Sequence, residues 1–406
     1  MLAFFSTLIN VSYISFFFAH NGYLPSPFIY DKWDTFMDFF NPLFWVDLPG
    51  IYTEWQSVYP PLNFIILKLY KEFLFLEFTN YLNSFELRAL LENDIKYVVL
   101  SYAMILIISV EIIFKDIVLL PVRILICIST LFSSYFLFGL ERGNLIIISL
   151  LVLAIYINAK TELGKALSFA ILVNLKPYFL IIYLVRLLDY KNTANNHFLF
   201  LAPLLSALIF ILTGLILGQE YYMLPLNILG FASKKGLLSP SEVLTLPTSM
   251  TAISYLVKII VEFKVPSIVS LAVKLTVFFY LFKLLKLAFK KKCSTNDLSI
   301  IAIIFITNYS VSSGPYAMLF YLAVIGILYR IKEFQLLLLI TIMLYGGILD
   351  LIPIYHYKDD MQNVYLSGEL IEIESYLTLG TVVRPVINFM FLILFIQRIK
   401  KLEPKP

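Results

Sequence analysis

The chain has 406 residues, of which 60% are hydrophobic and only 14% charged, and its formal net charge at pH 7 is +4. Soluble proteins carry about 25% charged residues, so the composition argues against a water-soluble protein. Lysine and arginine cluster between hydrophobic blocks, which indicates membrane topology and not a nucleic-acid-binding surface. The apolar residues form continuous blocks rather than alternating strands. The composition therefore predicts an all-α, polytopic integral membrane protein.

Hydrophobic blocks recur along the chain, and each approaches the roughly 20 residues of a membrane-spanning helix. They are 2–19, 61–78, 97–114, 117–138, 144–158, 166–186, 198–217, 265–286, 298–312, 315–331, 334–352 and 385–398. The first has no basic residues before it and no small-residue cleavage site, which is typical of a retained signal-anchor helix. Block 166–186 is interrupted by Lys176 and Pro177, so we expect about nine to twelve transmembrane or re-entrant helices.

Basic clusters between the blocks predict the orientation of the chain in the membrane. The clusters at 186–192, 290–292, 329–333 and 398–401 are typical of cytoplasmic loops. Segments 20–60, 218–264 and 353–384 would then face the opposite side. We accordingly divide the chain into an N-terminal transmembrane module, 1–217, with an acidic first outer loop at 20–60, and a C-terminal transmembrane module, 218–406, which carries the other two outer loops.

The first outer loop concentrates acid among aromatic residues. Its "DKWDTFMDFF" stretch places Asp31, Asp34 and Asp38 three and four residues apart, so they would share one face of a helix lying at the membrane surface. Desolvation there could raise the proton affinity of a carboxylate, which suits a general base. The alternative is an acidic loop in water. The "YPP" at 59–61 ends the loop and fixes the entry of the next helix.

Two cationic side chains interrupt apolar blocks. Arg142 lies in "ERGN" (141–144) together with Asn144, and Lys176 lies in "NLKP". An arginine at a membrane boundary can bind a phosphate through two parallel hydrogen bonds. A lysine beside a helix-breaking proline is typical of a residue that lines a cavity. The alternatives are a turn capped by Glu141 and Arg142, and a lysine that extends to the interface. The two cysteines show neither disulfide nor metal spacing.

Together these elements resemble a known family, the polyprenyl-phosphate-dependent glycosyltransferases of the GT-C superfamily. The matching elements are Asp34, Asp38, "GIY" (50–52), "YPP" (59–61), "ERGN" (141–144), "KPY" (176–178) and "SSGPY" (312–316). The pattern is that of the bacterial mannosyltransferase branch, with Asp38 where an aromatic is usual, no glutamine before Asn144, and no histidine after the late Ser-Pro element. These departures bring the chain closer to the phage-type serotype-converting O-antigen glucosyltransferases.

The resemblance implies transfer of a hexose, with glucose favoured, from an undecaprenyl-phosphate sugar to a periplasmic glycan such as O-antigen. It implies an inverting reaction in a bacterial inner membrane, with the active site facing the periplasm. Alternatives are a transporter or flippase of polysaccharide precursors, an O-antigen polymerase, and polyprenyl-phosphate mannose as the donor.

The resemblance also assigns roles to residues of the chain. Asp34 would be the catalytic base, and Asp31, Asp38, Tyr52 and Tyr59 would orient the acceptor. Arg142, Lys176 and Asn144 would bind the phosphate of the donor lipid. We expect no cofactor beyond a divalent cation that Asp31 or Asp38 could hold, and we expect no dedicated metal site.

Overall fold

The computed structural model describes residues 2–21, 24–25, 28, 35–73, 83–91, 93–189, 193–234, 267–309, 315–364 and 370–404. Asp31 and Asp34 lie outside the described residues, as does 235–264 of the predicted second outer segment.

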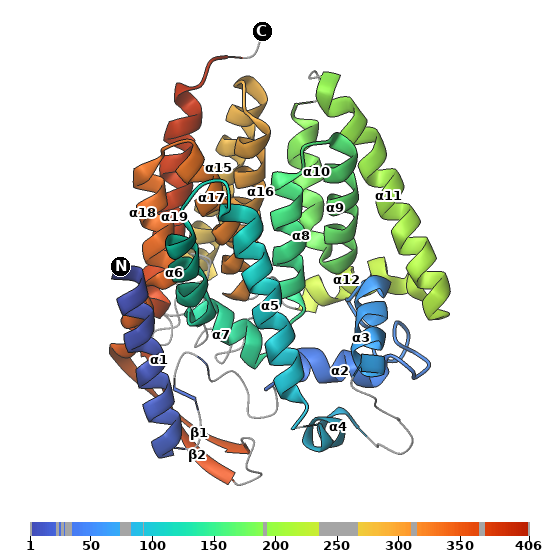
Figure 1. Ribbon diagram of the computed structural model, residues 1–406, viewed down its shortest axis with the longest axis vertical. Coiled ribbons are helices and arrows are strands. Elements are labelled where there is room, and N and C mark those ends of the chain that lie inside the picture. Colours follow the sequence, from blue (N-terminus) through green and yellow to red (C-terminus); the bar gives the residue numbers. More distant parts are fainter. Residues whose placement is uncertain are drawn as a thin grey trace.

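The described chain is mostly helical, as predicted, and its longer helices stand side by side in a bundle (Figure 1). The α-helices are α1 (Leu2–Asn21), α2 (Met37–Trp45), α3 (Pro61–Phe73), α4 (Ser84–Leu90), α5 (Ile95–Phe114), α6 (Leu120–Leu131), α7 (Ser134–Glu141), α8 (Ile146–Asn158), α9 (Glu162–Leu175), α10 (Leu180–Leu187), α11 (Thr193–Leu217), α12 (Leu224–Lys234), α15 (Ser267–Lys290), α16 (Thr295–Tyr309), α17 (Tyr321–Arg330), α18 (Phe334–Tyr345) and α19 (Leu379–Lys401). The short 3₁₀ helices are η1 (Pro177–Phe179), η2 (Tyr221–Met223), η3 (Pro315–Phe320) and η4 (Gly347–Leu351).

Within the described residues, four helices are long and apolar enough to cross a membrane, namely α1, α5, α11 and α19. The pair α6 and α7 bends by 52° at a short break and would make a fifth span if counted as one. Shorter apolar helices lie at α8, α10, α16, α17 and α18. The larger number of crossings that the sequence indicates stays a prediction.

The helix breaks that proline predicts are confirmed. α3 begins at Pro61, which is the second proline of the "YPP" element. α9 ends at Leu175, Lys176 is extended with φ −141° and ψ 108°, and Pro177 opens η1. Proline disfavours the helical conformation in the residue before it, so the chain turns at Lys176 and returns through α10.

The third predicted outer loop contains a β-hairpin rather than an irregular segment. Strand β1 (Pro353–Val364) pairs antiparallel with β2 (Leu370–Thr378), and Pro353 lies opposite Thr378. The stretch "IEIESY" in β2 alternates with period two, which is a strand pattern. Helix α19 starts at Leu379, inside the range 353–384 that the sequence assigns to the loop. The all-α expectation therefore holds apart from this hairpin.

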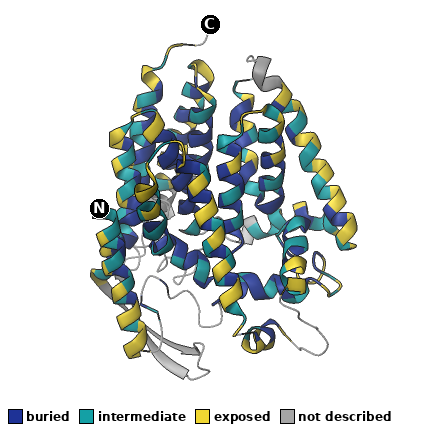
Figure 2. Cartoon of the chain, in the orientation of Figure 1, coloured by how far each residue is buried: buried dark blue, intermediate teal, exposed yellow. Residues whose placement is uncertain are grey.

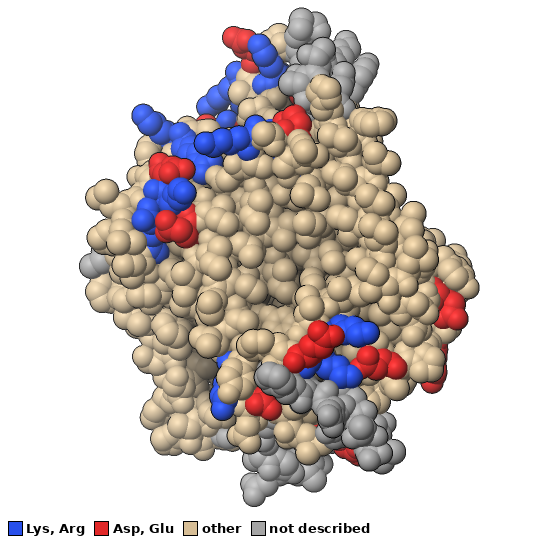
Figure 3. Space-filling model, turned by 45° about the vertical axis from the view of Figure 1, so that its right-hand side comes forward, with Lys and Arg blue, Asp and Glu red and all other residues tan. Residues whose placement is uncertain are grey.

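The two ends of the bundle differ in their charged residues. Arg398 of α19 pairs with Asp297 of α16 and with Glu333, and the backbone N–H of Lys292 donates to Glu403 O, so three of the predicted cytoplasmic clusters meet at one end. α2, α12 and the hairpin lie toward the other end (Figure 1). Figure 3 shows an uncharged belt across one face, between charged groups above and below it.

Candidate functional site

The segment that leads into α2 pairs with the end of α7. The N–H of Phe36 donates to Glu141 O at 2.7 Å, and the N–H of Asp38 donates to Arg142 O at 3.1 Å. Phe36 has a φ of 61°, a left-handed conformation that prevents α2 from extending backward through it. Helix α2 begins at Met37, and Asp34 lies outside the described residues, so the expectation that Asp34 and Asp38 share one helix face stays a prediction.

Asp38 accepts hydrogen bonds from both predicted phosphate-binding residues of the "ERGN" element. Arg142 Nη2 lies 3.2 Å from Asp38 Oδ1, and Asn144 Nδ2 lies 2.6 Å from Asp38 Oδ2. The Asn144 side-chain oxygen accepts from the N–H of Ile146 at 2.9 Å, which fixes the orientation of its amide at the start of α8. Arg142 is only 5% exposed, so this ion pair forms in surroundings where its charges are weakly screened.

Gly143 allows this close approach. Its φ is +65°, and a Cβ at this position would lie 2.8 Å from Phe39 Cβ and 2.9 Å from a ring carbon of Phe36. Its carbonyl accepts from the Tyr102 hydroxyl at 2.9 Å. The glycine in "ERGN" is therefore required both by the backbone conformation and by the packing of α2 against this turn.

Gly143→Ala is expected to lower the free energy of unfolding by about 3 kcal/mol or more, since it adds steric overlap to left-handed strain. Gly218→Ala is the matched control, because Gly218 has a φ of +67° and a Cβ added there would meet nothing within 4 Å, and strain alone costs about 1–2 kcal/mol. Unfolding of both variants in detergent measures the difference. Equal losses would show that the contact with α2 contributes nothing.

Lys176 reaches the same end of the bundle from the turn between α9 and η1. Its Nζ lies 4.6 Å from the ring centre of Tyr59, a cation–π distance. The side-chain amide of Asn63 on α3 donates to Asn174 O at 3.3 Å and to Leu175 O at 3.0 Å. These bonds tie the "YPP" helix start to the end of α9, so the two sequence motifs are held together.

The ammonium of Lys176 is unusually placed. Lys176 as a whole residue is 8% exposed, and among the described residues no ion pair involves its ammonium. It interacts electrostatically with Asp38, which partly offsets the cost of burying a charge. A buried cation near, but not paired with, a carboxylate is a suitable partner for an anionic ligand.

Tyr52 holds the loop that precedes the "YPP" helix start. Its side chain is fully buried, and its hydroxyl donates to Tyr59 O at 3.0 Å. Burial raises the pKa of Tyr52, so the phenol stays neutral and keeps its proton. The Asn227 amide of α12 donates to Tyr52 O at 2.8 Å. This placement favours a role in positioning the loop over direct contact with an acceptor.

The structure adds two tyrosines to the site, and the sequence alone did not identify either of them as a site residue. Tyr316 of η3 interacts electrostatically with Asp38, Arg142 and Tyr59. Tyr178 of η1 interacts in turn with Tyr316 and so belongs to the same buried group. The signal for both was present, since Tyr316 ends the "SSGPY" element and Tyr178 ends "KPY".

The predicted site is therefore assembled in part. Asp38, Tyr59, Arg142, Asn144 and Lys176 meet at one end of the bundle, from segments far apart in the sequence. Asp34, the predicted base, and Asp31, predicted to orient the acceptor, lie outside the described residues.

Metal ligands do not cluster in the part of the chain that the structure describes. Among those residues, no group of three or more His, Cys, Asp or Glu could hold a metal ion. The divalent cation considered for Asp31 or Asp38 stays a prediction.

Arg142 pairs with Asp38, and Lys176 interacts electrostatically with the same carboxylate, so both cations lie near Asp38. Arginine supplies a planar two-donor fork and lysine a compact charge.

In comparisons with known proteins, no family model matches the chain, and neither a curated protein nor a solved structure matches it.

Proposed function

We propose that this protein is a multi-pass membrane glycosyltransferase that moves a hexose, with glucose favoured, from undecaprenyl phosphate to a periplasmic glycan such as O-antigen. The observation that carries the proposal is the meeting of Asp38, Arg142, Asn144 and Lys176 at one end of an apolar helical bundle. A donor that is itself a lipid would present its phosphate at such an end while its chain stays in the bilayer.

Placement in a membrane is supported by the outer surface of the bundle. Leu204, Leu208, Ile211 and Leu215 recur at helical spacing along α11 and are between 46% and 64% exposed. Figure 2 shows exposed residues along the outer side of this helix. A soluble protein rarely exposes so long an apolar stripe, whereas hydrocarbon chains would cover it.

In the proposed reaction, an acceptor hydroxyl attacks the anomeric carbon of the donor sugar. Its oxygen forms the new glycosidic bond, and the bond from the anomeric carbon to the phosphate oxygen breaks. The electron pair of that bond leaves with undecaprenyl phosphate, and the hydroxyl proton passes to Asp34. Attack on the face opposite the leaving group inverts the anomeric configuration.

The cations would act on the departing phosphate. Negative charge grows on the leaving oxygen as the bond breaks, and a fixed ammonium and guanidinium stabilise that charge without rearranging. Lys176 is proposed to contact the phosphate directly. Asp38 and Asn144 are proposed to hold Arg142 and the start of α8 in the geometry that binds the phosphate.

The test is sugar transfer from undecaprenyl-phosphate glucose in membranes that contain the wild-type protein or Asp34→Asn. The variant is expected to lose about 10²–10⁴-fold in rate, because removing a general base costs that much. Asp47→Asn is the control, since Asp47 is an acid of the same outer loop that pairs with Lys71. Full activity of Asp34→Asn would remove this residue from its role. Absence of transfer by the wild type from any lipid-linked sugar would contradict the proposal and favour a transporter.

A further inference from the structure

A polar cavity lies at the opposite end of the bundle from Asp38. It is an open cavity of about 650 Å³ between α5, α8, α9, α16 and α17, a volume within the usual range for small-molecule sites. Tyr102 on α5 contacts the candidate site, and Lys115, thirteen residues later, lines this cavity. At 1.5 Å per helical residue, about 20 Å separates the two.

The lining is polar and carries more basic than acidic side chains. The basic residues are Lys115, Lys160, Lys165 and Arg330, and the acidic ones are Glu111 and Asp116.

Ion pairs already neutralise one acidic and one basic residue of the lining. Glu111 pairs with Arg123 at 3.0 Å, and Lys165 shares the carboxylate of Glu162 with Arg186. Among the described residues, no ion pair or hydrogen bond involves the ammonium groups of Lys115 or Lys160. Lys115, Lys160 and Arg330 then outnumber Asp116 in the lining, so the cavity keeps a net positive charge that favours an anion.

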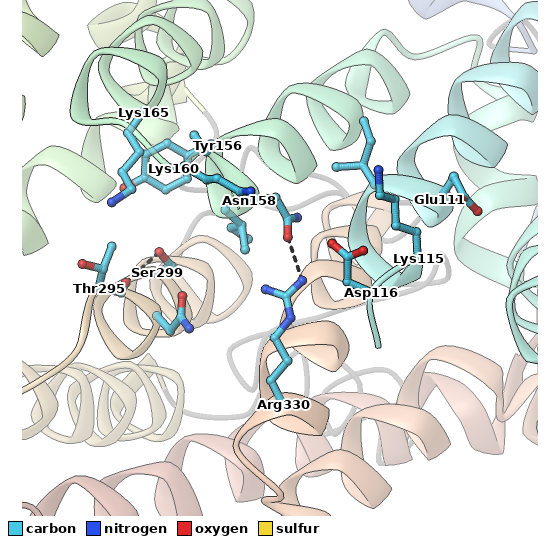
Figure 4. Close-up of a pocket in the computed structure, with 14 residues that line it drawn as sticks. Glu111, Lys115, Asp116, Tyr156, Asn158, Lys160, Lys165, Thr295, Ser299 and Arg330 are labelled. Atoms are coloured by element: carbon cyan, nitrogen blue, oxygen red, sulfur yellow. Dashed lines mark hydrogen bonds between the residues drawn. The ribbon is translucent and has the colours of Figure 1, made fainter. Parts of the chain in front are cut away.

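The arrangement of the lining also suits an anion. Arg330 reaches from α17 and donates to Asn158 Oδ1 at 2.7 Å, as Figure 4 shows, and to Ile113 O at 3.2 Å. These bonds fix the guanidinium at the cavity wall. Thr295, the first residue of α16, also lines the cavity. The carboxylate of Asp297 already caps the start of α16, since it accepts from the N–H of Ser294 at 2.9 Å, so the positive charge of the lining comes from its basic side chains.

We infer that this cavity binds a phosphate-bearing ligand on the basic face of the protein, through Lys115, Lys160 and Arg330. The bound group is a phosphate or pyrophosphate, which belongs either to a small soluble molecule or to the headgroup of an anionic lipid. The site is separate from the proposed sugar-transfer site, and its binding can be measured without any transfer activity.

The test uses full-length protein in nanodiscs of phosphatidylcholine, titrated with inorganic pyrophosphate at low ionic strength. Lys115→Gln/Lys160→Gln is expected to weaken binding by about 10-fold or more, because it removes two charged donors to the anion. Lys400→Gln/Lys401→Gln removes two exposed lysines at the same end of the bundle that do not line the cavity. This control is expected to change the affinity by less than about 2-fold.

A parallel arm distinguishes a soluble ligand from a lipid. The shift in thermal midpoint is compared between nanodiscs of phosphatidylcholine alone and nanodiscs that also contain phosphatidic acid. A shift with phosphatidic acid that Lys115→Gln/Lys160→Gln abolishes and the control keeps would assign the site to a lipid headgroup. Selective loss of pyrophosphate binding would assign it to a soluble ligand. Equal losses in both double variants, or no response of the wild type to either probe, would overturn the inference.

Discussion

Lys176→Met is expected to lower sugar transfer by about 10²–10³-fold, the usual effect of removing one electrostatic contact to a developing negative charge. The same change is expected to leave the thermal midpoint unchanged or higher, because a buried ammonium without an ion pair is replaced by an apolar side chain of similar length. Activity and stability would then move in opposite directions. Transfer assays in membranes and thermal unfolding in detergent measure the two quantities.

The matched control is Lys68→Met. Lys68 lies on α3, close in sequence to the "YPP" helix start, but its side chain is exposed, so its replacement is expected to change neither quantity. A loss of transfer in Lys176→Met that follows a comparable loss of stability would assign Lys176 a structural role. Unchanged transfer at an unchanged midpoint would remove it from the proposed phosphate contact.

Asp350→Asn is expected to lower the free energy of unfolding by about 3–5 kcal/mol, because it leaves a buried guanidinium without its counter-charge. Asp350 of η4 pairs with Arg384 of α19, and the two residues are 1% and 2% exposed. Ser134 Oγ of α7 also donates to Asp350 Oδ2 at 2.8 Å. The carboxylate therefore joins three elements that are distant in the sequence.

Two further variants separate the charge effect from packing. Asp350→Asn/Arg384→Met removes both charges and is expected to recover much of the lost stability. Asp47→Asn breaks the more exposed pair with Lys71 and is expected to cost no more than about 1 kcal/mol. Unfolding of all three proteins in mixed detergent micelles provides the comparison. A single Asp350→Asn variant as stable as Asp47→Asn would show that the buried pair does not stabilise the fold.

The local pattern of the sequence predicts the helices and their breaks. Long apolar blocks produce helices such as α5 and α11, because their period and length leave no other way to satisfy the backbone in an apolar setting. Pro61 starts α3, and Pro177 stops α9 before Lys176. These outcomes depend on the conformations that proline and its neighbour can adopt, and no distant part of the chain has to be known.

The sequence also identified several residues of the candidate site without their mutual arrangement. Arg142 and Lys176 stand out because a charge that interrupts an apolar block is costly in a membrane and marks a candidate functional site. The sequence does not predict which residue pairs with Arg142. Asp38 joins Arg142 across 104 positions of the chain, and no periodicity in either segment encodes that distance.

The tertiary structure alone decided how α2 begins and which charges are paired. The sequence pattern of the first outer loop does not show where its helix begins, whereas the left-handed Phe36, whose N–H donates to Glu141 O, precedes the helix start at Met37. The Asp350–Arg384 pair also arises only when η4 and α19 meet. The length of the apolar blocks and the positions of proline thus determined where this chain is helical. Contacts between segments far apart in the chain, which satisfy buried polar groups, decided which of its charges lie together.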